Sequence, residues 1–263
     1  MKKGCMNNFM NFGFNSKKAQ ITIFIIIVVV VIAVAGVAYY ITDSNKQFSS
    51  DPAIQEQFDT LRDSVLTCSD ITTIEALNAI GIQGGYYDAP EKSFDMEWAF
   101  IPYYYYEGVA IVPTTSKVEE ELGKFVNDNL PLCLESLDKN DFTLDYKTPK
   151  TKVEIVQGDV NFIIDQPISI SREKRTVTFD LKDTPKSYSL PLIDILDLAK
   201  YIADEAVKND KNICLTCIAK EAENRNLLVD LVNFEEAGTL IVITENYTAS
   251  GQYSLEFLNK YKE

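Results

Sequence analysis

The chain contains no histidine among its 263 residues, which removes the commonest general base and the commonest metal ligand of enzymes. It also lacks the phosphate-binding motifs G-x-x-x-x-G-K-S/T and G-x-G-x-x-G, and it has no complete calcium-binding loop. No stretch rich in glycine, serine or proline divides residues 42–263 into separate parts. These absences predict a non-catalytic protein that uses no cofactor and no metal.

Basic residues are scarce in most of the chain. Residues 42–263 contain 21 basic residues and all 39 acidic residues, so their formal charge is −18. A surface of this sign repels the phosphates of nucleic acids and the headgroups of anionic lipids. We therefore expect no nucleic acid partner. The charge suits cations or basic partners, or it serves solubility alone.

The longest apolar run extends from Ile21 to Ile41, with Thr22 as its one clearly polar residue. As a helix it would be about 31 Å long, close to the hydrocarbon thickness of a bilayer. We predict a transmembrane helix over residues 20–41, with the lipid bilayer as its partner. Residues 1–19 contain four lysines and no acid, which predicts a cytoplasmic N-terminus. Residues 42–263 should then form an extracellular domain of a single-pass protein of the cell membrane.

The junction before this run reads Lys17-Lys18-Ala19-Gln20, a basic pair followed by a small residue and a glutamine. It resembles the archaeal class III signal peptides of type IV pilin-like proteins. The resemblance implies that a prepilin-type peptidase cuts between Ala19 and Gln20, which leaves residues 1–19 as a cytoplasmic leader. Phe24 stands where many members of that family have a glutamate associated with subunit assembly. The alternative interpretation is an uncut signal anchor.

Four further stretches resemble uncharacterised archaeal single-pass surface proteins, and that resemblance implies location and architecture only. They are "IGIQGGYY" at 80–87, "IPYYYYE" at 101–107, "LPLCLESL" at 130–137 and "ICLTC" at 213–217.

The residue patterns after the membrane run predict an α+β domain with a largely antiparallel sheet. Apolar residues at helical spacing predict a stalk helix over about 52–68, and Asp70 suggests a second short helix that Gly81 ends. Ser116 and Glu119 match a capping box for a helix to about Leu137, which Pro131 should kink or interrupt. The other expected elements are strand pairs in 152–164 and 168–181, helices from Pro191 and from Cys214 to about Glu223, a hairpin across 235–238, and an edge strand over 253–258.

Four cysteines lie after the membrane run, where an extracellular setting allows disulfides to persist. Three pairings of four cysteines are possible, and we favour Cys68–Cys133 with Cys214–Cys217. The second pair forms a C-x-x-C motif at the expected start of a helix, a position that stabilises a thiolate. The alternative function is therefore an extracytoplasmic thiol-disulfide oxidoreductase that uses Cys214 and Cys217.

Aromatic residues gather between residues 86 and 106. Four consecutive tyrosines, Tyr103, Tyr104, Tyr105 and Tyr106, follow Trp98 in a stretch that reads as strands. Alternate residues of a strand face opposite sides, so the run suits a strand covered on both faces. The functional interpretation is an exposed surface that binds a glycan or a protein partner.

Asn246 begins the glycosylation sequon Asn246-Tyr247-Thr248 after an expected strand. Taken together, the patterns predict a membrane-anchored cell-surface protein that is a structural component, pilin-like in its N-terminus, or an interaction module.

Overall fold

The computed structural model describes residues 52–209, 213–234, 237–246 and 253–262. The leader, the Ala19–Gln20 junction and the apolar run over 20–41 therefore lie outside the described residues. The fold below is that of the compact unit formed by residues 57–263, together with the first turn of the helix that enters it.

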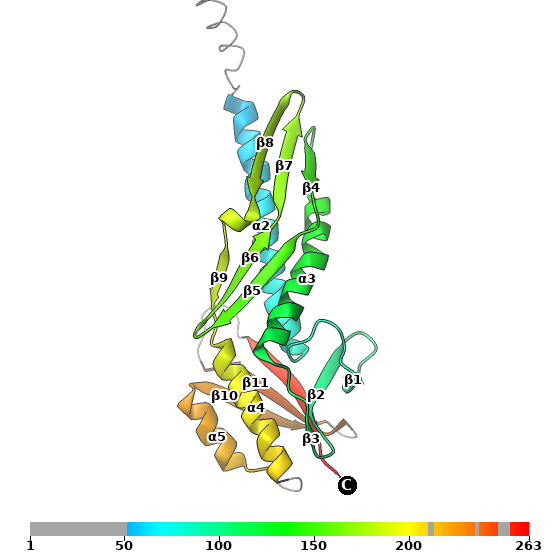
Figure 1. The fold of residues 1–263 in the computed structure, drawn as a ribbon, viewed down its shortest axis with the longest axis vertical. Helices are drawn as coiled ribbons and strands as arrows, with labels where there is room; N and C mark the ends of the chain where they lie inside the picture. The colour runs from blue at the N-terminus through cyan, green and yellow to red at the C-terminus, as the bar shows by residue number, and fades with distance from the viewer. Residues whose placement is uncertain (1–51, 210–212, 235–236, 247–252, 263) are drawn as a thin grey trace, which may run out of the picture. The chain divides into compact units, whose positions relative to one another are not determined.

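The described residues form the expected α+β fold (Figure 1). The helices are α2 (Pro52–Ile82), α3 (Thr115–Ser136), α4 (Leu192–Lys208) and α5 (Leu215–Asn224). The strands are β1 (Ser93–Asp95), β2 (Phe100–Tyr106), β3 (Val109–Ala110), β4 (Thr143–Tyr146), β5 (Lys150–Val156), β6 (Asp159–Asp165), β7 (Pro167–Arg172), β8 (Arg175–Asp180), β9 (Lys186–Ser189), β10 (Leu227–Asn233), β11 (Thr239–Glu245) and β12 (Ser254–Lys260).

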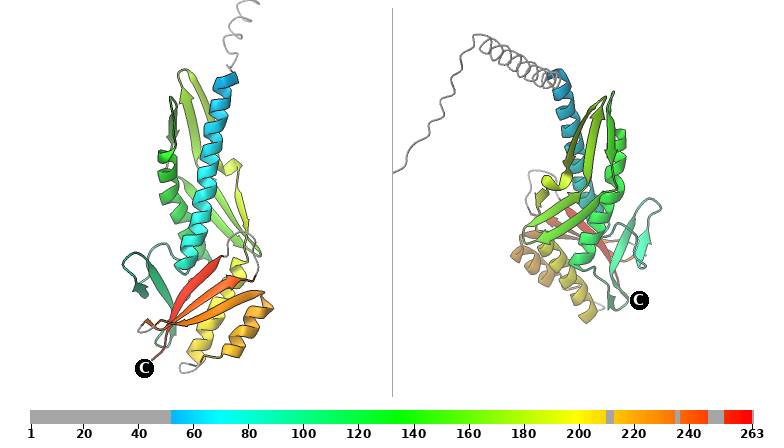
Figure 2. Two further views of the ribbon diagram at one scale, coloured as in Figure 1. Left: turned by 180° about the vertical axis from the view of Figure 1, so that it is seen from behind. Right: turned by 45° about the horizontal axis from the view of Figure 1, so that its top comes forward.

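Three sheets contain these strands. The largest has the order β1-β2-β12-β11-β10, with β3 beside β2, and every pair in it is antiparallel except β12 with β2. The other two sheets, β4-β7-β8 and β5-β6-β9, are antiparallel throughout. Helices α4 and α5 cover one face of the largest sheet, as Figure 2 shows from behind. The prediction of a largely antiparallel sheet is confirmed.

The helix expected over about 52–68 is present, but it continues as α2 to Ile82, so the expected new start at Asp70 and end at Gly81 are wrong. Nothing between residues 69 and 80 breaks a helix, because neither glycine nor proline occurs there. The carboxylate of Asp70 pairs with Lys186 Nζ at 2.8 Å instead of capping a helix. Beyond Ile82 the backbone adopts the left-handed conformation at Gly84 and Gly85, which ends the helix.

Length and composition make α2 the one described helix apolar enough to cross a membrane, over Ile54–Ile82. Half of an 18-residue apolar window within it is buried inside the protein. Phe58, Leu61 and Val65 are buried, and the side chains of Arg62 and Arg175 lie over aromatic rings where α2 packs on β8. The described part of α2 therefore has the packing of a core helix.

Helix α3 begins one residue after Thr114, whose hydroxyl accepts the N–H of Lys117 at 3.2 Å. The expected capping box at Ser116 is therefore wrong. Glu119 instead accepts the N–H of Ile155 on β5 at 2.8 Å. The helix also continues through Pro131 to Ser136, and the Cys68–Cys133 disulfide fixes its last turn to α2.

The strand pairs at 152–164 and 168–181, the helix after Pro191 and the hairpin β10–β11 are confirmed. The expected edge strand at 253–258 is instead β12, which lies between β11 and β2. Leu255, Phe257 and Leu258 are fully buried, as the centre of a sheet requires.

Candidate binding site

The structure joins the cysteines in the two pairs favoured from the sequence. Cys68 of α2 is bonded to Cys133 of α3, with the Cα atoms 5.7 Å apart, and both ends lie in helices of the core. Cys214 is bonded to Cys217, three positions further along the chain, at the start of α5. The hydroxyl of Thr216 lies 3.7 Å from Cys214 Sγ, and both cysteines are half-buried.

The tyrosine run is not the exposed surface considered above. Tyr104 and Tyr105 are completely buried in β2, Tyr103 is 7 % exposed, and only Tyr106 is half-buried. Tyr104 stacks on Phe257 of β12, with ring centroids 4.2 Å apart. Because β2 is paired with β12 and covered on both faces, its aromatic side chains form core, and the candidate interaction surface at Tyr103–Tyr106 is a wrong prediction.

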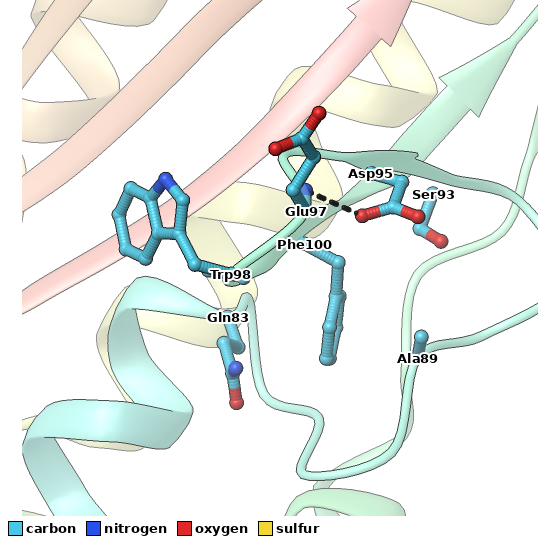
Figure 3. Close-up of a pocket in the computed structure, with 8 residues that line it drawn as sticks. Gln83, Ala89, Ser93, Asp95, Glu97, Trp98 and Phe100 are labelled. Carbon is cyan, nitrogen blue, oxygen red and sulfur yellow. Dashed lines mark hydrogen bonds between the residues drawn. The ribbon is translucent and has the colours of Figure 1, made fainter.

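The exposed aromatic residue of this region is Trp98, which is 82 % exposed. It lies in the turn between β1 and β2, beside a cavity of about 320 Å³ (Figure 3). The residues that line this cavity, here called the Trp98 cavity, come from the segment that follows α2 and from the β1–β2 hairpin. They are Gln83, Ala89, Ser93, Asp95, Glu97, Trp98, Ala99 and Phe100.

The turn that carries Trp98 is fixed by short-range hydrogen bonds. The N–H of Met96 donates to the carbonyl oxygen of Ala99 at 2.8 Å. Glu97 adopts a left-handed conformation with φ of 71°, and its N–H donates to Asp95 Oδ1 at 2.8 Å. In Figure 3 the side chain of Phe100 extends below the turn toward Gln83, while Trp98 and Glu97 stand outward from it. The hairpin therefore presents the indole without covering it.

A buried carboxylate holds the segment between α2 and the cavity residue Ala89. Glu121 of α3 accepts the N–H groups of Tyr87 and Asp88 at 2.7 and 3.0 Å, and it pairs with Lys117 Nζ at 2.7 Å. Burial acts to raise the pKa of Glu121, but the bonds from Lys117 and the two N–H groups together outweigh it, so this pKa lies below its ordinary value. These contacts fix the segment that runs from α2 to Ala89.

A second cavity of about 310 Å³ lies between α2 and the segment 138–142. Arg172 lines this cavity, and its guanidinium group already has partners. It donates to Gln57 Oε1 at 2.5 Å and pairs with Asp141 at 3.2 Å. The same group lies over the ring of Phe142, 5.2 Å from its centroid. These contacts give Arg172 a structural role.

Asn246 is exposed after the end of β11, and its Nδ2 donates to Asn226 Oδ1 at 3.1 Å. The two residues that complete its sequon lie outside the described residues, so glycosylation stays a prediction. Among the described residues, no group of three or more cysteine, aspartate or glutamate side chains is arranged to hold a metal ion.

The sequence patterns did not single out Gln83, Asp95 or Glu97. One sequence feature could have pointed to them: a charged residue precedes the tryptophan between two short apolar stretches, as at the tip of a hairpin. The fold and its sites define an α+β domain joined by two disulfides, with an indole exposed beside a cavity. Comparison of the chain with protein-family models, with curated proteins and with solved structures finds no match.

Proposed function

We propose that this chain is a membrane-anchored cell-surface protein that acts as a non-catalytic interaction module through the Trp98 cavity. The apolar run over 20–41 supplies the anchor, and the lysines of residues 1–19 favour a cytoplasmic N-terminus. Two disulfides support an oxidising compartment for residues 42–263. A prepilin-type peptidase that cuts at Ala19–Gln20 fits the same topology, and a pilin-like structural role belongs to this class of function.

The main support for this proposal is the exposure of Trp98. An indole is among the largest apolar side chains, and it stabilises a fold only where it is covered. Of the other aromatic residues of this region, Tyr103, Tyr104 and Tyr105 are buried and the rest are half-buried. Tryptophan is enriched among the residues that dominate binding energy at protein interfaces. An exposed indole beside a cavity is therefore better explained by a partner than by the fold.

Photo-crosslinking on intact cells tests this proposal. Benzoylphenylalanine in place of Trp98, in the full-length protein at the cell surface, should give a discrete adduct on irradiation. The control places the same residue at Leu132 of α3, which is 61 % exposed and does not line the cavity. The absence of an adduct from position 98, or the same adducts from both positions, would overturn the proposal.

The disulfide at the start of α5 favours a second candidate function, thiol-disulfide exchange. A helix N-terminus stabilises a thiolate, and the hydroxyl of Thr216 lies near Cys214 Sγ. In this reaction a dithiol substrate becomes a disulfide while the Cys214–Cys217 bond is reduced to two thiols. The full-length protein should then oxidise a dithiol peptide, and Cys214→Ser should abolish the activity. No oxidation by the wild-type protein would exclude this candidate.

A further inference from the structure

The charged groups that line the Trp98 cavity are all negative. Two of the eight residues, Asp95 and Glu97, are acidic, and none is basic. The surrounding residues 42–263 carry a formal charge of −18. A negatively charged ligand would therefore meet repulsion from the two carboxylates of the cavity and from the net charge of the domain.

The same groups offer more hydrogen-bond acceptors than donors. The two carboxylates only accept hydrogen bonds, and the Ser93 hydroxyl already donates to the carbonyl oxygen of Pro90 at 3.1 Å. The amide of Gln83 can both accept and donate, and the indole N–H of Trp98 only donates. A saccharide presents hydroxyl groups that need donors as well as acceptors. An ammonium or guanidinium group presents donors alone, so it matches this set of side chains better.

We propose that the Trp98 cavity binds a lysine or arginine side chain from a basic segment of a partner protein, an inference that rests on the proposed function. The cation lies over the face of the Trp98 indole, where the ring quadrupole attracts it. The carboxylates of Asp95 and Glu97 accept its N–H groups. The apolar side chains of Ala89, Ala99 and Phe100 contact the methylene stem, as amphipathic side chains prefer.

The size of the cavity fits this occupant. About 320 Å³ is near the lower end of the range for ligand cavities, which suits a single side chain. The hairpin is also preorganised, because Asp95 Oδ1 holds the N–H of Glu97 and fixes the turn before Trp98. Little ordering is then needed on binding, which favours affinity.

The chain contains one tryptophan, so its fluorescence reports directly on this cavity. The full-length protein in detergent is titrated with a ten-residue lysine-rich peptide that lacks aromatic residues. We expect a saturable change in Trp98 fluorescence that weakens as salt concentration rises. A glutamate-rich peptide of the same length and a neutral oligosaccharide should leave the fluorescence unchanged. A response to the oligosaccharide and none to the lysine-rich peptide would overturn the proposal in favour of a glycan.

Variants test whether the lysine-rich peptide binds at this cavity or is attracted to the acidic protein in general. By calorimetry, Trp98→Ala should weaken binding of the peptide between about 2-fold and 30-fold, and Trp98→Phe should weaken it less because a phenyl ring keeps part of the interaction. Asp95→Asn and Glu97→Gln should each weaken it, whereas Glu223→Gln on the exposed surface of α5 should not. Equal affinity in Trp98→Ala and the wild-type protein would overturn the proposal.

The two experiments distinguish failure of the basic partner from failure of the interaction module. A discrete photo-crosslink from position 98, together with no response of Trp98 to the lysine-rich peptide, would exclude a basic partner and leave the interaction module in place. Loss of both signals would overturn both.

Discussion

The hydroxyl of Tyr104 donates a hydrogen bond to the carbonyl oxygen of Gly84 at 2.9 Å, inside the core. The bond joins the middle of β2 to the turn that ends α2, and that turn precedes the residues beside the Trp98 cavity. Tyr104 and Trp98 are six residues apart, yet one aromatic side chain is fully buried and the other is 82 % exposed.

This contrast predicts opposite effects on stability. Tyr104→Phe leaves a buried carbonyl without its donor, so the free energy of unfolding should fall by about 1–2 kcal/mol. Trp98→Ala removes an exposed side chain, so it should change stability by less than about 0.5 kcal/mol. Urea unfolding of the full-length variants measures both. A large loss of stability in Trp98→Ala would show that the indole serves the fold.

Gly84 should tolerate a side chain far less well than Gly158, although both have positive φ. A Cβ at Gly84 would lie 2.5 Å from Pro102 Cγ and 2.7 Å from the carbonyl oxygen of Glu256, whereas nothing lies within 4 Å at Gly158. Gly158→Ala should cost about 1 kcal/mol from backbone conformation alone. Gly84→Ala should cost about 3 kcal/mol, because steric crowding adds to it. Equal losses in the thermal unfolding of the two variants would contradict the contacts at Gly84.

Many local features could be predicted from the sequence because short-range chemistry sets them. The alternation over 152–164 and the Gln157-Gly158 turn specify the β5–β6 hairpin. The apolar stripe after Pro191 specifies the buried face of α4. These patterns need no knowledge of distant residues.

The remaining features depend on contacts between distant segments. The β12 strand could not be placed beside β2 from the sequence, because their parallel pairing joins Leu258 to Tyr103. That pairing buries the tyrosine run. Tyr104 therefore belongs to the core, although it lies in the same aromatic stretch of sequence as the exposed Trp98. The cavity also needs Gln83, which α2 brings to the hairpin only by continuing past Asp70.

The two disulfides should differ in their contribution to stability. Cys68 and Cys133 are 65 residues apart, and the chain-entropy relation gives about 4 kcal/mol for closing that loop. The Cys214–Cys217 loop of three residues gives about 1.6 kcal/mol. Replacing the first pair by alanines should therefore lower the melting temperature by roughly 10 °C, and replacing the second should lower it much less. The reverse order in calorimetry would contradict a structural role for Cys68–Cys133.

Glu121 should make stability depend on acid pH. Its pKa is lower in the folded protein than its ordinary value of 4.5, so its stabilising contribution is present above about pH 4.5 and is lost as the pH falls through the folded value. Glu121→Gln should lower the free energy of unfolding at neutral pH by about 1–2 kcal/mol and flatten this acid dependence. Denaturant unfolding between about pH 3 and pH 7 measures the effect.

The neighbouring Glu120 provides a matched control, because it also pairs with Lys117, at 3.4 Å, but is exposed. Glu120→Gln should change stability by less than about 0.5 kcal/mol. The same acid dependence in wild-type protein and Glu121→Gln would assign the effect to other carboxylates.

Hydroxyl-radical footprinting of Trp98 tests most directly whether this residue is the contact site of a surface interaction module. Oxidation of the full-length protein is compared on intact cells and after purification in detergent, with exposed Leu132 and Leu215 as internal references. We expect Trp98 to be strongly oxidised in the purified protein and protected on cells, while both leucines are modified equally in the two samples. Equal oxidation of Trp98 in both samples would contradict this expectation.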